Sequence, residues 1–206
     1  NAFPSDRYAV QSQLKLHGNH PNNDLIILQP NDGAIITTDG ILDCFEHHGD
    51  EIAMVLIGGV NYYSGQAFDM EAITTKAHTY NCVVGFDLAH GAGNLKLDLH
   101  DWGVDFAAWC GYKYLNGGPG APSGVFIHER HLGKTDIPRF EGWWGHDKST
   151  RFAMPGEFIP METAEAWQLS NPPIMAMAPL LASLEIFHEA GMENLVAKSI
   201  QLTDYL

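Results

Sequence analysis

The sequence is short of basic residues and of long apolar runs, and each shortage excludes a class of partner. Its 206 residues include 11 lysines and arginines against 25 aspartates and glutamates, which gives a formal charge of −14. Phosphate binding needs a footprint of lysine and arginine, so we expect no nucleic-acid partner. No run approaches the roughly 18 uninterrupted apolar residues of a membrane span, so we expect no membrane partner. The partners that we expect are therefore small molecules or other proteins.

Cysteine is also scarce, with only Cys44, Cys82 and Cys110, widely separated and without CxxC spacing. An odd count with no signal-like N-terminus predicts reduced thiols in a cytoplasmic protein. A domain of this size buries roughly 70% of the surface of its unfolded chain, so it needs no disulfide or metal to fold. We expect the thiols to be buried and structural.

The first two thirds of the chain alternate between apolar runs typical of buried strands and segments typical of helices. Strands are predicted at 25–28, 52–57, 82–86, 105–110 and 124–127. Helices are predicted at 4–14 (capped by Ser5), from a Thr38 cap to Gly49, at 69–80, at 174–190 and from 192 to the end. Strands without polar alternation are buried on both faces, and helices supply the crossovers between them. The pattern therefore predicts an α/β fold with a mostly parallel sheet and flanking helices.

Two polar residues follow apolar runs at the positions where such sheets bind ligands, beyond the carboxyl ends of the strands. Asp87 follows the 82–86 run, and Lys113 lies just past the 105–110 run, between two tyrosines. Either residue alone is typical of a turn or a surface. A desolvated lysine can act as an amine nucleophile, and an aspartate can hold the ring nitrogen of a pyridinium protonated. The pair together predicts pyridoxal 5'-phosphate as cofactor.

Other cofactors are less well supported by the residues. His47 and His48 are adjacent on a predicted helix, so they point about 100° apart and cannot clamp one ion. The sequence has no HExxH motif and no cysteine cluster, so no metal site is predicted. The run 117–120 is rich in glycine but lacks the Gly-Lys-Ser/Thr of a nucleotide-binding loop. A flexible loop near the cofactor fits it better.

Several segments occur in the same order as in kynureninase, and the chain resembles that family over essentially its whole length. They are Phe3-Pro4-Ser5-Asp6, Gly85-Phe86-Asp87-Leu88-Ala89-His90, Tyr112-Lys113-Tyr114-Leu115-Asn116, Gly142-Trp143-Trp144-Gly145-His146 and Ser170-Asn171-Pro172-Pro173. The resemblance implies the aspartate-aminotransferase fold (type I) and pyridoxal 5'-phosphate. It also implies hydrolysis of L-kynurenine or 3-hydroxykynurenine to anthranilate or 3-hydroxyanthranilate and L-alanine, in tryptophan catabolism and NAD biosynthesis.

The resemblance gives the central residues of the site their roles. Lys113 would bind the cofactor covalently and later move the Cα proton. Asp87 would pair with the pyridine nitrogen, and His90 would lie near the phenolic oxygen of the ring. Tyr112 would either transfer a proton in the later steps or donate a hydrogen bond to the phosphate, and the residues do not favour one role.

The remaining residues carried over from the family surround these. The four residues from Phe3 to Asp6 would bind the cofactor, with Phe3 stacked on its ring and Asp6 among its contacts. Trp143 and Asn171, with Tyr112, would contact the phosphate or substrate end, some of them from the partner subunit of a homodimer. The structural alternatives are plain packing for Phe3, a core or interface aromatic for Trp143 and a turn residue for Asn171.

The resemblance also divides the chain. Residues 1–173 would form most of the cofactor-binding large domain, and 174–206 would lead towards a C-terminal small domain. The last helical stripe stops without a terminator, so we expect the chain to belong to a longer protein. Two other functions stay open: a pyridoxal-phosphate lyase similar to cysteine desulfurases, and a truncated dimerisation module without turnover. A desulfurase would need a reactive cysteine in a mobile loop, whereas all three cysteines lie in predicted elements.

Overall fold

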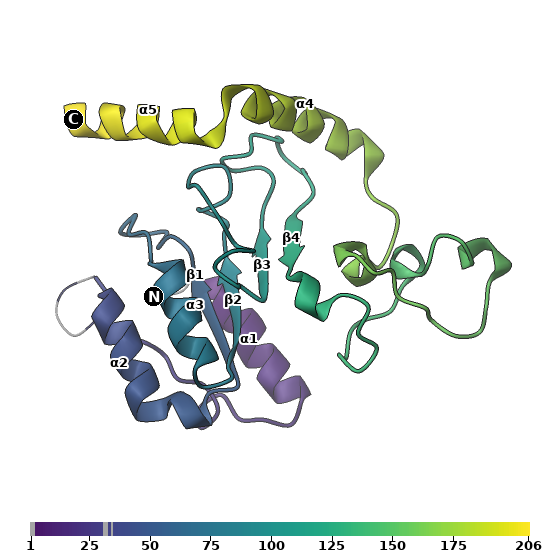
Figure 1. The fold of residues 1–206 in the computed structure, drawn as a ribbon, viewed down its shortest axis with the longest axis horizontal. Helices are drawn as coiled ribbons and strands as arrows, with labels where there is room; N and C mark the ends of the chain where they lie inside the picture. Colours follow the sequence, from purple (N-terminus) through teal and green to yellow (C-terminus); the bar gives the residue numbers. More distant parts are fainter. Residues whose placement is uncertain (1–2, 31–32, 34) are drawn as a thin grey trace.

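A four-stranded sheet forms the centre of the structure, a computed structural model that describes residues 3–30, 33 and 35–206 (Figure 1). Its strands lie in the order β1 (Met54–Gly58), β2 (Val83–Asp87), β3 (Phe106–Trp109) and β4 (Gly124–Ile127). The first three are parallel, and β4 is antiparallel to β3. The predicted α/β fold with a mostly parallel sheet is confirmed.

The register brings the carboxyl ends of β1, β2 and β3 to one edge of the sheet. Gly58 lies opposite Asp87, and Asp87 lies opposite Ala108. The backbone continues this alignment past the strands, because the Gly59 amide donates to the Asp87 carbonyl and the Leu88 amide to the Ala108 carbonyl, both at 2.8 Å. Side chains that follow these strands therefore meet at this edge.

Five α-helices surround the sheet: α1 (Pro4–Leu16), α2 (Thr38–His48), α3 (Met70–His78), α4 (Ile174–Ala190) and α5 (Met192–Tyr205). Short 3₁₀ turns lie at 49–51, 129–131, 143–145, 151–153 and 164–167. The last two α-helices extend across the top of Figure 1, beside the loops that leave the sheet. Within the described parts of the chain, no helix is both long and apolar enough to cross a lipid bilayer.

Three local predictions are wrong. The 25–28 run forms no strand. Its residues Ile26 and Ile27 are exposed, whereas the prediction required a strand that is buried on both faces. The cap of α2 is Thr37, whose hydroxyl accepts from the Gly40 amide at 3.1 Å, rather than Thr38. Helix α1 begins after Phe3 without a side-chain cap, because Pro at the first helical position has no amide hydrogen that needs a partner, so Ser5 is not its cap.

The core lies between β2 and the two helices α2 and α3. Val84 and Phe86 of β2 are fully buried, as are Ile73 and Ala77 of α3. Packing is tight along β2, since a Cβ at Gly85 would lie 2.1 Å from the ring of Phe106 on the next strand. This rigid centre fixes the ends of β2 and β3, from which the site is built.

A buried carboxylate at the other edge of the sheet joins several elements. Asp105 precedes β3, is 4% exposed, and accepts hydrogen bonds from the Val84 amide at 2.8 Å, His78 at 2.9 Å and His131 at 2.7 Å. The Arg130 guanidinium lies 3.5 Å away. Burial alone would raise the pKa of Asp105, but the hydrogen bonds from His78, His131 and Val84 outweigh it and hold the pKa below its ordinary value.

We expect Asp105→Ala to lower the free energy of unfolding by about 3–5 kcal/mol, because it leaves buried donors without an acceptor. Denaturant unfolding measures the change. The matched control is Asp101→Ala on the same loop, whose carboxylate is exposed and pairs with His100, and which should cost about 0–1 kcal/mol. Equal losses for the two variants would contradict the structural role of Asp105.

The same network predicts a pH dependence. The pKa of Asp105 is lower in the folded state than its ordinary value of 3.8, so its carboxylate stabilises the fold at pH values above about 4. The stabilisation is lost as the pH falls through the folded-state pKa. The difference in unfolding free energy between wild type and Asp105→Ala should therefore shrink below about pH 4.

Candidate active site

A lysine amine and a histidine ring meet at the carboxyl edge of the sheet. Lys113 follows β3, His90 follows β2, and the Lys113 Nζ atom lies 3.0 Å from His90 Nε2. The other ring nitrogen, Nδ1, lies 3.5 Å from the hydroxyl of Tyr114, whose ring packs edge-on at 5.9 Å. An ammonium group can only donate, so beside a protonated Lys113 the Nε2 atom accepts and Nδ1 carries the hydrogen.

The turn after β2 fixes the position of His90. The Asp87 carboxylate accepts the Ala89 amide at 2.8 Å, and the Gly91 amide donates to the Leu88 carbonyl at 2.9 Å. The Leu88 side chain is fully buried and anchors the turn in the core. The histidine is therefore held by local hydrogen bonds and by packing.

The loop after β3 holds Lys113 in a similar way. Gly111 and Gly117 are joined by a backbone hydrogen bond of 2.9 Å, and the Asn116 amide closes a turn on the Lys113 carbonyl at 3.0 Å. A Cβ at Gly111 would lie 2.4 Å from the Pro122 carbonyl oxygen, so the loop is closed too tightly there for a side chain. Within this closed loop the Lys113 side chain is half-buried.

Two carboxyl groups approach the same edge from different elements. Asp6 on α1 comes close enough to Asp87 at the end of β2 for its protonated carboxyl to donate a hydrogen bond to it. Burial, then the hydrogen bond and the charge of Asp87, raise the pKa of Asp6 to about 6, while the Lys113 charge opposes the shift. Below about pH 6 the Asp6 carboxyl therefore takes up a proton.

His90 is under the influence of both the amine and the acid. Burial lowers its pKa, the Lys113 charge lowers it further, and the Asp87 charge opposes the change. The imidazole is therefore neutral at pH 7, with one nitrogen able to donate and one able to accept. Lys113 lies 3.0 Å from His90, Asp87 ends the strand that leads to His90, and the charges of Lys113 and Asp87 both act on His90 and on Asp6.

The set of groups fits pyridoxal 5'-phosphate. Among the described residues no carboxylate forms an ion pair with the Lys113 amine, whose close partner is an imidazole, so the amine is available as a nucleophile. A carboxylate that carries one negative charge matches a protonated ring nitrogen. The neutral imidazole can donate to a phenolic oxygen.

Two other predicted residues flank these groups. Phe3 precedes Asp6 at the start of α1, and its ring meets the Tyr62 ring edge-on at 5.3 Å. Tyr112 is next to Lys113 and 55% exposed. Pro4 and Ser5 lie in the first turn of α1 and are exposed, and no described contact joins their side chains to the lysine.

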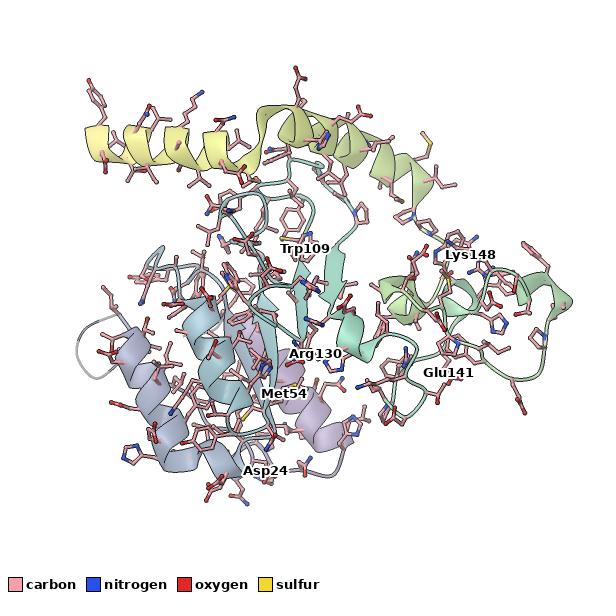
Figure 2. All side chains as sticks on the ribbon, viewed as in Figure 1. Asp24, Met54, Trp109, Arg130, Glu141 and Lys148 are labelled. Carbon is pink, nitrogen blue, oxygen red and sulfur yellow. The ribbon has the colours of Figure 1, made fainter. Side chains whose placement is uncertain are left out.

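Trp143 and Asn171 lie elsewhere in the chain. They belong to the segment 140–173, which extends beyond β4 on the right of Figure 1. Figure 2 shows Glu141 and Lys148 of this segment well apart from Trp109 at the end of β3. Trp143 is 40% exposed, Asn171 is exposed, and none of the described contacts joins either to Lys113. One copy of the chain therefore does not bring these two residues to the others.

Tyr114 is a residue of the site that was not predicted. Its hydroxyl and ring both contact His90, and it follows Lys113 directly in the sequence. The sequence signal that could have identified Tyr114 was its position directly after Lys113 in the Tyr112-Lys113-Tyr114 motif, because a neighbouring aromatic residue lies in the same turn as the lysine.

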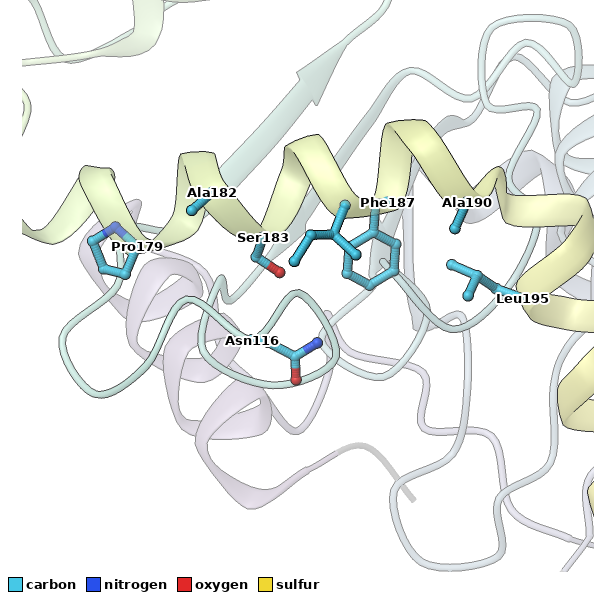
Figure 3. A pocket seen from close by; sticks show the side chains of 8 residues that line it. Asn116, Pro179, Ala182, Ser183, Phe187, Ala190 and Leu195 are labelled. Atoms are coloured by element: carbon cyan, nitrogen blue, oxygen red, sulfur yellow. The ribbon is translucent and has the colours of Figure 1, made fainter.

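A groove lies next to the site rather than in it. It has a volume of about 520 Å³ and runs beneath α4, where Figure 3 shows Asn116 on the Lys113 loop across from the helix. Its lining is mostly apolar: Asn116, Pro179, Ala182, Ser183, Ile186, Phe187, Ala190 and Leu195. It contains no titratable group, so we assign the chemistry to the Lys113 edge of the sheet.

The described residues contain no group of three histidine, cysteine or acidic side chains that could hold a metal ion. Cys44, Cys82 and Cys110 are free thiols; Cys82 is buried and the other two are half-buried. The expectation that all three thiols are buried is confirmed for Cys82 alone.

Comparison with known proteins identifies the family. Residues 22–206 match the family model of aminotransferase class-V. The whole chain is 59% identical to a kynureninase of Myxococcus xanthus and 58% identical to one of Koribacter versatilis, and covers 48% and 49% of them. The chain thus spans about half the length of the curated relatives it matches, and its resemblance to kynureninase is confirmed.

Solved structures agree on the fold. A cysteine desulfurase of Thermococcus onnurineus NA1 matches 98% of the chain with a TM-score of 0.70, and the chain covers 47% of it at 19% identity. An alanine–glyoxylate aminotransferase of Nostoc sp. matches 87% of the chain with a TM-score of 0.64, and the chain covers 45% of it at 19% identity. Sequence and fold together show that the chain belongs to the aminotransferase class-V family.

Proposed function

We propose that this chain is the cofactor-binding part of a hydrolase that cleaves L-kynurenine or 3-hydroxykynurenine. The products are anthranilate or 3-hydroxyanthranilate and L-alanine, in tryptophan catabolism and NAD biosynthesis. The observation that carries the proposal is the meeting of Lys113, His90 and the Asp6–Asp87 pair at one sheet edge. The substrate class comes from the kynureninase relatives.

The cofactor of aminotransferase class-V proteins is pyridoxal 5'-phosphate, and when bound it withdraws electrons from the substrate carbon next to the amine. In our proposal the chain's residues hold and tune it. Lys113 attaches it covalently and moves the Cα proton, Asp87 keeps the ring nitrogen protonated, and His90 donates to the phenolic oxygen. Phe3 covers one face of the ring.

Tyr112 has two proposed roles, and the site geometry is compatible with both. Its 55% exposure leaves the hydroxyl free to approach a substrate or a phosphate. Proton transfer in the later steps would need it within hydrogen-bond distance of the reacting atom. Tyr112→Phe separates the roles, because loss of a proton donor lowers kcat, whereas loss of a phosphate contact weakens cofactor binding.

The domain division and the oligomeric state are also part of the proposal. Residues 1–173 form most of the large domain, and 174–206 lead towards a small domain. The protein is a cytoplasmic homodimer whose partner subunit completes the site with Trp143 and Asn171. In support, the segment 140–173, to which both residues belong, extends beyond β4 in Figure 1, and none of the described contacts joins either residue to Lys113.

A cysteine-desulfurase-like lyase has less support. The likeness to a desulfurase at 19% identity shows the fold alone. That reaction needs an accessible, mobile thiol, whereas Cys82 is buried and burial raises the pKa of both Cys44 and Cys82. A binding module without turnover stays as the second alternative.

Release of fluorescent anthranilate from L-kynurenine by the full-length protein with added pyridoxal 5'-phosphate tests the proposal. We expect turnover in the ordinary enzyme range, about 1–10³ per second, with L-alanine formed in equal amount. Sulfur release from L-cysteine would instead favour the desulfurase. Cofactor binding without either product would favour the module and overturn the proposed reaction.

A further inference from the structure

Arg151 is a buried cation in the segment beyond β4. It is 6% exposed and begins the 3₁₀ turn Arg151–Ala153 (η4). Its guanidinium donates to the carbonyl oxygens of Trp144 and, at 2.9 Å, His146. Its Nε is buried without a partner, and in the part of the chain described here no carboxylate forms an ion pair with it. A buried charge without a counter-ion is costly, so these carbonyls and the neighbouring rings must stabilise it.

Two indole rings supply the rest of its surroundings. The guanidinium carbon lies 4.9 Å from the centre of the Trp144 ring and 5.8 Å from that of Trp143. Trp143 also meets the Phe152 ring edge-on at 5.6 Å. Arg151 therefore contacts both the backbone and the side chains of the turn Trp143–Gly145 (η3), while Trp143 stays 40% exposed.

His146, directly after that turn, is held in one tautomer. The Ile159 amide donates to its Nδ1 at 3.1 Å, so Nδ1 accepts and Nε2 carries the hydrogen of the neutral ring. Nε2 then donates to the Thr150 hydroxyl, also at 3.1 Å. The side chain of His146 is thereby held by two hydrogen bonds, and its carbonyl accepts from Arg151.

The same turn is packed against the backbone that leads to Asn171. The Trp144 amide donates to the Leu169 carbonyl at 3.4 Å. A Cβ at Gly142 would lie 2.3 Å from the Leu169 carbonyl oxygen, so no side chain fits there. The turn Trp143–Gly145, which Arg151 contacts, is thus packed against the backbone at Leu169, two residues before Asn171.

We propose that Arg151 is a positioning residue that holds the Trp143 indole in the orientation needed for cofactor binding. The inference rests on the proposed function, in which Trp143 contacts the phosphate or substrate end. Arginine suits this place because its Nη2 donates to two carbonyls while the planar guanidinium lies close to both indole rings. Lysine carries the charge, but it lacks the planar, weakly hydrated guanidinium that favours contact with aromatic faces.

The test is the affinity of the full-length protein for pyridoxal 5'-phosphate in Arg151→Met. We expect its Kd to rise about tenfold, equivalent to about 1.4 kcal/mol, with kcat at saturating cofactor nearly unchanged. The matched control is Arg139→Met: that guanidinium lies 4.3 Å from the Trp167 ring in the same segment, apart from both residues of the turn. The Kd of Arg139→Met for pyridoxal 5'-phosphate should stay at the wild-type value.

A double-mutant cycle with Trp143→Phe separates positioning from general stability. If Arg151 acts through Trp143, Arg151→Met should weaken binding little further in the Trp143→Phe protein. Additive losses, or equal losses in the Arg139→Met control, would overturn the inference. Arg151→Lys is the second variant, with an intermediate Kd expected; if neither variant folds, the role is structural and the inference is wrong. A wild-type protein that binds no cofactor would instead overturn the proposed function.

Discussion

Lys113→Ala should abolish covalent attachment of pyridoxal 5'-phosphate and nearly all turnover of kynurenine. The variant removes the one amine at the site and, in our proposal, the group that moves the Cα proton. Loss of a positioned acid–base group alone costs up to about 10⁴-fold in rate. Borohydride reduction followed by peptide mapping should label the wild-type peptide that contains Lys113 and leave the variant unlabelled.

Lys96→Ala provides the matched control for this experiment. Lys96 is exposed and forms surface ion pairs with Asp98 and Glu193, so its loss should change neither labelling nor turnover. Circular dichroism of Lys113→Ala should match wild type, because the half-buried amine contributes one described contact, to His90. A Lys113→Ala protein that still turns over and is still labelled would show that another residue carries the cofactor.

Asp87→Asn should keep the cofactor attached but lower kcat by about 10²–10³-fold. Asparagine has nearly the shape of aspartate but no negative charge, so it cannot hold the ring nitrogen protonated. Attachment depends on Lys113, which the change leaves in place. Steady-state kinetics with kynurenine, together with borohydride labelling, measure the two effects separately.

Asp6→Asn distinguishes which carboxyl of the pair supplies the charge. The pKa of Asp6 is raised to about 6, so this group is the one that readily takes up a proton, and its replacement should cost less rate than that of Asp87. Asp39→Asn, on the exposed first turn of α2, should behave as wild type. The role of Asp87 would be refuted by near-wild-type turnover of Asp87→Asn, or by a larger loss in Asp6→Asn.

The sheet could be predicted from the sequence because its strands are short, apolar runs that end at polar residues. The predicted ranges for β1 to β3 differ from the observed ones by one or two residues at their ends, and β4 and α4 were predicted with the observed bounds. The prediction of a strand at 25–28 was wrong because an apolar run indicates only a tendency to form a strand. Whether it pairs depends on a neighbouring strand, which local sequence does not contain.

The site could be predicted in part for a related reason. Asp87 and Lys113 follow strands, and parallel strands bring their ends together. The approach of Asp6 to Asp87 depends on where α1 lies relative to the end of β2, which no local pattern encodes. The network at Asp105 was missed because a single acid before a strand looks like a turn residue until histidines from distant segments surround it.

The central claim is that Lys113 and Asp87 act on one and the same cofactor ring. A crystal structure of the full-length protein with bound pyridoxal 5'-phosphate tests it most directly. We expect Lys113 Nζ to be bonded to the cofactor and an Asp87 carboxylate oxygen to lie about 3 Å from the ring nitrogen of the same molecule. A ring attached elsewhere, or a ring nitrogen that faces a group other than Asp87, would contradict the account.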